Sequence, residues 1–178
     1  MAEPRAQACR YAGAVRRSRL SLILVGIVLV AGCGGADESV SKAEFIAAAD
    51  KICVLRDARG RTLAREKGTS VGRLSGKLAD VYADAIAQVE ALDLPAGAAR
   101  AGARRYVASV RAMRKSVTRM KAAAAQVENA SDLKALKDAS AQLRVNVSTV
   151  QASSDVADQN ARRYGMKSCG QQQSLPLT

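Results

Sequence analysis

The spacing of apolar residues constrains the fold most, because they recur at alternating steps of three and four over long stretches without proline. Proline occurs only at Pro4, Pro95 and Pro176, so few positions break a helix. Alanine dominates the apolar residues and aromatic residues make up only 3% of the chain, a composition that favours helix over strand. A length of 178 residues suits one ordinary domain. The sequence therefore predicts a single all-α domain.

The first two predicted helices cover residues 41–67 and about 70–92. Ser41 and Glu44 match a capping box, in which each side chain accepts a hydrogen bond from the other residue's backbone N–H. The expected core face of the first helix consists of Phe45, Ala48, Ala49, Ile52, Leu55 and Leu63. That of the second consists of Val71, Leu74, Leu78, Val81, Ala85, Val89 and Leu92, the stripe of an amphipathic helix.

The other two predicted helices follow Pro95, which we expect to open the third helix, and the turn at residues 129–132, which offers a cap for the fourth. The third core face consists of Ala99, Ala103, Tyr106, Val110, Met113, Val117, Met120, Ala124 and Val127. The fourth consists of Leu133, Leu136, Ser140, Leu143, Val147, Val150, Ser154, Ala157, Ala161 and Tyr164, and Gly165 ends this helix. Short connections imply antiparallel neighbours, so residues 41–170 are predicted to form an up-down-up-down four-helix bundle.

Residues 1–32 have the organisation of a signal peptide. A basic segment, residues 1–19, precedes an uncharged apolar run over residues 20–30. This run has the length of a signal-peptide core and is shorter than the roughly 20 residues of a membrane span. An uncleaved N-terminal membrane helix is the alternative. Arg16 and Arg17 allow a twin-arginine signal, but Arg19 stands where such signals prefer an apolar residue, so we favour the general secretory route.

Val30-Ala31-Gly32-Cys33 resembles the bacterial lipobox. The resemblance implies diacylglycerol transfer to the Cys33 sulfur, cleavage after Gly32 and acylation of the new amino group. Two acyl chains provide stable anchoring where one is marginal. Because the basic leader stays in the cytoplasm, we expect a protein anchored in the cell membrane and facing its extracytoplasmic side. Residues 33–40 are then a flexible tether and residues 171–178 a disordered tail.

The four cysteines divide between processing and the fold. Cys9 leaves with the signal peptide and Cys33 is the lipidation site, so Cys53 and Cys169 remain in a compartment that permits disulfides. One bridge between them is the simplest assignment and adds about 4–5 kcal/mol by loop entropy. Reactive chemistry is the alternative, but the sequence has no histidine to act as a base or to complete a zinc site. We expect no catalytic residue, no metal and no cofactor.

Basic residues concentrate on the third predicted helix. Five of the 28 basic and one of the 16 acidic residues lie in residues 1–32, so the rest of the chain has a net charge of +8. The basic face consists of Arg100, Arg104, Arg105, Arg111, Arg114, Lys115 and Arg119, and no acidic residue interrupts it. Such a face suits the phosphates of anionic lipid or of a cell-wall polymer, and a solvated face is the alternative. The export signal and the scarcity of stacking aromatics disfavour nucleic acid.

Three further motifs are F-x-x-x-A-D-x-I-C over Phe45–Cys53, the break at residues 92–95, and Y-G-x-x-x-C-G over Tyr164–Gly170. Together they resemble small uncharacterised lipoproteins of high-GC actinobacteria. The resemblance implies a secreted helical domain and brings no activity with it. We expect a non-catalytic module that binds or organises a component of the envelope. The alternative is a carrier whose ligand pocket is lined by Tyr106, Met113 and Met120.

Overall fold

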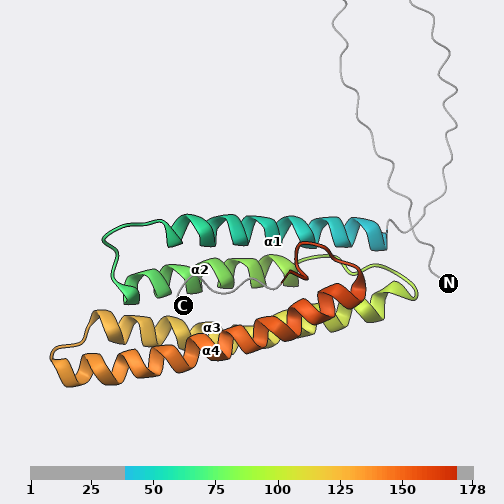
Figure 1. Ribbon diagram of the computed structural model, residues 1–178. Helices are drawn as coiled ribbons and strands as arrows, with labels where there is room; N and C mark the ends of the chain where they lie inside the picture. Colours follow the sequence, from blue (N-terminus) through green and yellow to red (C-terminus); the bar gives the residue numbers. More distant parts are fainter. Residues whose placement is uncertain (1–38, 172–178) are drawn as a thin grey trace, which may run out of the picture. The chain divides into compact units, whose positions relative to one another are not determined.

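The computed structural model describes residues 39–171, which form four antiparallel helices running up, down, up and down (Figure 1). The helices are α1 (Lys42–Ala64), α2 (Val71–Glu90), α3 (Ala99–Glu128) and α4 (Leu133–Tyr164). Helix α1 packs on α2, α2 on α3 and α3 on α4. The predicted all-α four-helix bundle is therefore confirmed. The predicted signal peptide, Cys33, most of the predicted tether and all but the first residue of the predicted tail lie outside the described residues.

The helix ends follow local sequence signals with two exceptions. The capping box is present, because Ser41 Oγ accepts from Glu44 N at 3.2 Å and a Glu44 carboxylate oxygen accepts from Ser41 N at 2.8 Å. Helix α1 ends three residues before the predicted Lys67. The prediction that Pro95 opens the third helix is wrong. Gly97 has φ +62°, which no right-handed helix accommodates, so α3 begins after it and Pro95 is buried in the connection.

The hydrophobic core combines side chains from all four helices with two from the segment that follows α4. Its largest fully buried side chains include Phe45, Leu78, Met120 and Val150. All buried members of this cluster lie between Phe45 and Cys169. A chain that begins at residue 34 therefore contains the whole core of the described domain and has what it needs to fold alone.

Four apolar residues predicted on core faces are exposed instead. The exposed fraction is 47% for Leu55, 64% for Val71, 82% for Leu133 and 40% for Leu136. On α1 the buried stripe runs through Phe45 and its neighbours one and two turns later, and Leu55 lies about 100° away from it. The other three belong to the first turns of α2 and α4 at one end of the bundle, where their side chains meet solvent.

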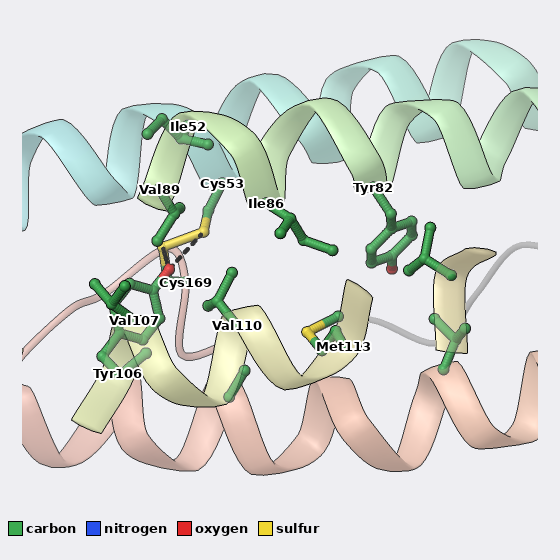
Figure 2. Close-up of a cluster of buried hydrophobic side chains, with 14 of the residues drawn as sticks. Ile52, Cys53, Tyr82, Ile86, Val89, Tyr106, Val107, Val110, Met113 and Cys169 are labelled. Atoms are coloured by element: carbon green, nitrogen blue, oxygen red, sulfur yellow. Dashed lines mark hydrogen bonds between the residues drawn. A yellow bond between two sulfur atoms is a disulfide. The ribbon is translucent and has the colours of Figure 1, made fainter. Parts of the chain in front are cut away.

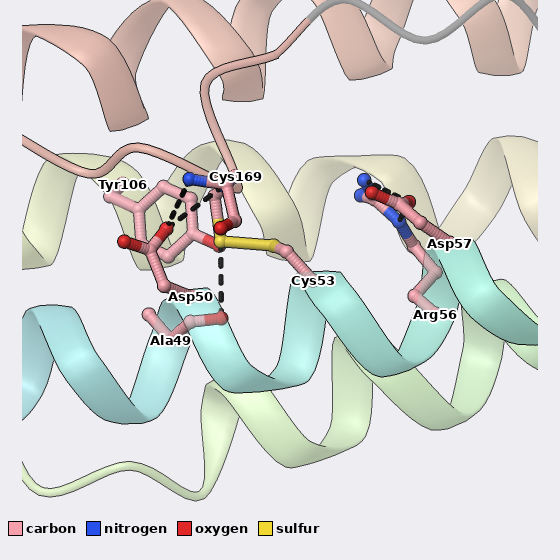
Figure 3. Close-up of polar contacts among 8 residues, drawn as sticks. Ala49, Asp50, Cys53, Arg56, Asp57, Tyr106 and Cys169 are labelled. Atoms are coloured by element: carbon pink, nitrogen blue, oxygen red, sulfur yellow. Dashed lines mark hydrogen bonds and ion pairs between the residues drawn. A yellow bond between two sulfur atoms is a disulfide. The ribbon is translucent and has the colours of Figure 1, made fainter.

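The C-terminal segment, residues 165–171, turns back from the end of α4 towards α1 (Figure 1). Gly165 ends α4 in the left-handed conformation, with φ +103°, as predicted. One carboxylate then holds the segment, because Asp50 on α1 accepts the backbone N–H groups of Lys167, Ser168 and Cys169 at 3.0, 2.8 and 3.0 Å (Figure 3).

The disulfide predicted between Cys53 and Cys169 is present, with Cα atoms 5.2 Å apart and 116 residues between them in sequence. Both cysteines are buried, and the Tyr106 hydroxyl donates to Cys169 Sγ at 3.2 Å (Figure 2). The bridge joins the middle of α1 to the C-terminal segment. It therefore links the first helix to the segment that follows the last helix.

Candidate anion-binding site

All seven residues of the predicted basic face are exposed on α3, but acidic residues of α2 neutralise its middle part. Arg111 Nε lies 3.0 Å from one carboxylate oxygen of Glu90, and Arg114 contacts the other oxygen. Further along α3, Lys121 pairs with Asp80 at 2.6 Å. The sequence along α3 could not reveal these pairs, because their acidic partners belong to another helix. The continuous basic arc predicted from the sequence is therefore interrupted.

Positive charge is concentrated at the start of α3. Within residues 39–171, Arg100, Arg104 and Arg105 make no ion pair. The first turn of α3 holds no acidic residue, and its N-cap, Ala98, has no side chain to accept the free N–H groups. These N–H groups carry the positive end of the helix dipole. Three arginines thus add to a helix end that is already positive.

We define the basic end of the bundle as Lys42, Arg100, Arg104, Arg105 and Arg163. Lys42 begins α1, Arg163 lies in the last turn of α4, and all five side chains are exposed. The start of α1, the start of α3 and the end of α4 lie at the same end of the antiparallel bundle (Figure 1). Lys115 and Arg119 lie about 15–30 Å further along α3 than the three arginines at its start, at 1.5 Å per residue. The basic end is therefore a local feature rather than a property of the whole helix.

A pocket of about 200 Å³ opens at this end, in the seam between α3 and α4. Its lining consists of Gly102, Arg105, Asn160, Arg163 and Tyr164. None of these five residues is acidic, and each guanidinium carries five N–H donors. Arg105 belongs to the predicted basic face, whereas Arg163 and Asn160 belong to a different helix and were not predicted. The spacing of the arginines on α4 does not predict this pocket.

The ring of Tyr164 forms one wall of the pocket and is held from several sides. A Cβ atom on Gly102 would lie 2.5 Å from the ring, so the absence of a side chain there lets the ring approach α3. Phe45 packs against the ring edge to face, with centroids 5.8 Å apart, and Lys42 Nζ lies 4.9 Å from its centroid. The Tyr164 hydroxyl is buried and has no hydrogen-bond partner among the described residues. The wall is therefore rigid and contains an unused polar group.

A second charged cluster lies inside the bundle. Arg56 pairs with Asp57 at 2.8 Å (Figure 3) and lies 5.5 Å from the centroid of the Tyr82 ring. Asp158 of α4 is only 5% exposed, and burial raises its pKa to about 6, against the opposing effect of the Arg56 and Arg162 charges. This cluster was not predicted from the sequence, because Arg56 and Asp57 interrupt the apolar stripe of α1. The cluster therefore places charged side chains inside the bundle, away from the basic surface of α3.

The side chains proposed to line a carrier's pocket fill the core instead of bounding a large cavity. Tyr106, Met113 and Met120 are 2%, 3% and 0% exposed. The cavity bordered by Tyr106, Met113 and Asp158 measures about 20 Å³, which is room for a single water. Burial in this region raises the pKa of Tyr106. A carrier that used this pocket would have to separate its helices, so the geometry gives the carrier alternative no support.

The chain was also compared with known proteins. No protein-family model, curated protein or solved structure matches it. Between residues 39 and 171, no helix is long and apolar enough to cross a membrane. The same residues contain no group of three or more His, Cys, Asp and Glu side chains that could hold a metal ion.

Proposed function

We propose that the chain is a lipid-anchored, non-catalytic envelope module that rests its basic end on the anionic phospholipids of the membrane. The observation that carries this proposal is the gathering of five exposed cations where α1 begins and α4 ends. Each Lys or Arg close to an anionic membrane surface contributes about 1 kcal/mol of attraction. The five cations outnumber the two exposed acidic residues of this end, Glu44 and Asp93, so the balance of charge favours one orientation of a tethered domain.

The position of the basic end along the chain supports the same proposal. Lys42 is nine residues from Cys33, and an extended chain of this length spans at most about 30 Å. Acylation of Cys33 would therefore keep the start of α1 close to the lipid headgroups. Because the Debye length at physiological ionic strength is about 8 Å, charges at this end interact with the membrane far more strongly than charges near Lys115.

Two sequence features support the anchoring half of the proposal. The lipobox-like residues Val30–Cys33 follow an apolar run with a basic start, and the resemblance to actinobacterial lipoproteins implies an extracytoplasmic location. The net charge of +8 after residue 32 suits a protein that faces an anionic surface. In this arrangement the anchor supplies the affinity and the basic end supplies the orientation.

Lipid labelling tests the anchor. We expect a bacterial host to incorporate labelled fatty acid into the wild-type chain and none into Cys33→Ala, because the substitution removes the acceptor sulfur. Immunoblotting of both chains provides the control for expression. Equal label in both chains would show that Cys33 is not acylated and would overturn the anchoring proposal.

Vesicle sedimentation tests the docking half without the anchor. We expect residues 34–178 to bind phosphatidylglycerol vesicles at low ionic strength and to be released at high ionic strength. Phosphatidylcholine vesicles, which carry no net charge, should not bind this protein. The double variant R100Q/R104Q should weaken binding by roughly thirtyfold, at about 1 kcal/mol for each lost cation.

The matched control is K115Q/R119Q, which removes the same charge from the same helix away from the basic end. We expect this variant to bind nearly as well as the wild type. Equal weakening in both double variants would contradict an oriented contact through the basic end. Absence of wild-type binding at low ionic strength would remove the docking proposal.

A further inference from the structure

We infer that the pocket between α3 and α4 binds the phosphate group of an anionic phospholipid headgroup through Arg105, Asn160 and Arg163. This inference rests on the proposed function, because a headgroup reaches the pocket only if the basic end faces the membrane. It goes further by naming one site and one chemical group in place of a diffuse attraction. Three properties of the pocket favour a phosphate: its shape, its charge and its unused hydrogen-bond donors.

The shape suits a small anion. A volume of about 200 Å³ corresponds to the space of six or seven waters at about 30 Å³ each, so a phosphate with part of its glycerol fits. The Tyr164 wall is held by Phe45 and by the close approach of Gly102. A rigid wall lowers the conformational entropy that binding would otherwise cost.

The charge of the pocket is positive before any ligand enters. Arg105 lies in the second turn of α3, near the positive end of that helix dipole, and no acidic side chain lines the pocket. Arg163 lies in the last turn of α4, where the negative end of the helix dipole stabilises a cation. The arginine is therefore stable there without an acidic partner. Two guanidinium groups from opposite sides of a seam match the oxygens of a phosphate, which accepts paired N–H donors.

Unused hydrogen-bond donors add a second line of support. Within residues 39–171, the side chains of Arg105, Asn160 and Arg163 make no hydrogen bond to protein. The buried Tyr164 hydroxyl likewise has no partner there. The donors of Arg105, Asn160 and Arg163 are therefore free for the oxygens of a ligand in the pocket.

Two larger hollows of the described surface lack this character. One is lined by Glu44 and Asp93 among its eight residues, and the other includes Asp138. Carboxylates repel a phosphate at short range. Of these three hollows, the one between α3 and α4 is the one whose lining attracts an anion.

The experiment is a titration followed by nuclear magnetic resonance. Residues 34–178 receive dihexanoyl phosphatidylglycerol below its micelle concentration, and the amide of Gly102 and the side-chain amide of Asn160 are observed. We expect saturable shifts at these positions. Dihexanoyl phosphatidylcholine should shift them less, because its quaternary ammonium is repelled by the two arginines. Inorganic phosphate alone reports binding of the bare anion.

Three variants assign the effect. R105Q/R163Q should lose the saturable shift and bind phosphatidylglycerol vesicles roughly thirtyfold more weakly, the change expected for two lost cations. K115Q/R119Q loses the same charge and should keep the shift. Asn160→Ala alters no charge and should weaken binding of the soluble lipid several-fold, because one hydrogen-bond donor is lost. Thermal unfolding midpoints close to the wild type would show that these exposed or half-buried positions leave the fold intact.

The outcomes separate this inference from the proposed function. Saturable shifts lost only in R105Q/R163Q and weakened in Asn160→Ala support the pocket. Equal vesicle binding losses in both double variants, with no saturable shift at Gly102, would overturn the pocket while leaving membrane docking in place. A third outcome is that inorganic phosphate saturates the pocket but the wild-type protein does not bind vesicles. This result would overturn both the headgroup as ligand and the proposed docking.

Discussion

At the scale of single residues, Gly102 lets the ring of Tyr164 lie against the backbone of α3. A Cβ atom at this position would lie 2.5 Å from one ring carbon and 2.7 Å from the next. Because Phe45 and Lys42 hold the ring on its other sides, the ring has little room to move away. We expect Gly102→Ala to lower the free energy of unfolding by about 1–3 kcal/mol, as overpacked cores do.

Gly76→Ala is the matched control for Gly102→Ala. Gly76 lies inside α2, and a Cβ atom there would lie 3.9 Å from Ala124 Cβ of α3, an ordinary van der Waals contact. There the substitution should raise stability by up to about 1 kcal/mol, because alanine loses less backbone entropy than glycine in a helix. Urea unfolding measures the free energy of unfolding of both variants. Changes of the same sign would contradict the close approach at Gly102.

Asp158 gives the fold a pH dependence of known sign. Its pKa rises from an ordinary value of 3.8 to about 6, first because it is buried and despite the opposing charges of Arg56 and Arg162. The folded state therefore binds more protons than the unfolded state between these two values. Stability falls as the pH rises through this window, and the loss is complete above it.

Asp158→Asn should remove that loss, because the amide has the shape of the carboxyl group and no charge. We expect a gain of about 1–3 kcal/mol at about pH 7.5 and little change at about pH 4. Urea unfolding at the two pH values measures this difference. Asp138→Asn, at an exposed ion pair with Lys134, is the control and should show little pH-dependent change. A gain of equal size at both pH values would rule out ionisation of Asp158 as the cause.

At the scale of elements, Asp50 organises the segment that follows α4. Its carboxylate accepts three successive backbone N–H groups, which would otherwise lie close to the buried disulfide without a partner in the protein. We expect Asp50→Ala to destabilise the fold by about 1–3 kcal/mol. The amides of Lys167, Ser168 and Cys169 should then exchange with solvent much faster, even with the disulfide intact.

Amide exchange in the same segment of Asp93→Ala, an exposed residue of the α2–α3 connection, is the control and should resemble the wild type. Unchanged protection in Asp50→Ala would show that the disulfide alone holds the segment. The disulfide itself constrains a separation of 116 residues, a contribution of about 5 kcal/mol in the loop-entropy model. The two devices act on the same segment, so we expect their effects to be non-additive.

At the scale of the whole molecule, Glu90 limits how much of the basic face is available to an anionic surface. It occupies both Arg111 and Arg114. Glu90→Gln would free these cations and raise the net charge by one. Arg111 and Arg114 lie about 9 and 14 Å further along α3 than Arg105, so screening weakens their attraction to the membrane. If the basic end docks on phospholipid as proposed, vesicle binding should strengthen by less than the roughly fivefold that one cation at the surface gives.

Asp138→Asn also raises the net charge by one, at the start of α4 and so at the opposite end of the bundle. Vesicle binding of this variant should change little, because screening confines the attraction to nearby charges. Vesicle sedimentation of both variants compares the same change in net charge at two different positions on the bundle. Equal strengthening would mean that net charge matters and orientation does not.

The accuracy of the sequence predictions follows from how each helix is buried. Helix α3 packs against both α2 and α4, so a broad face is buried. It includes the predicted stripe from Ala103 to Ala124, together with Val107 and Ala123 beside it. The outer helix α1 includes Arg56 and Asp57 in its inward side, with side chains 12% and 9% exposed. An apolar pattern cannot locate such a face, which explains the error at Leu55.

The sequence by itself determined the helical class, the four-helix order and the pairing of Cys53 with Cys169, because periodicity, turn residues and cysteine count are local or compositional properties. The anchor at Cys33 stays a prediction of the same kind. Only the tertiary structure decided that Glu90 neutralises part of the basic face and that Arg105 and Arg163 share a pocket. These are contacts between side chains of different helices, and their distances depend on how the helices pack, which no spacing along one helix specifies.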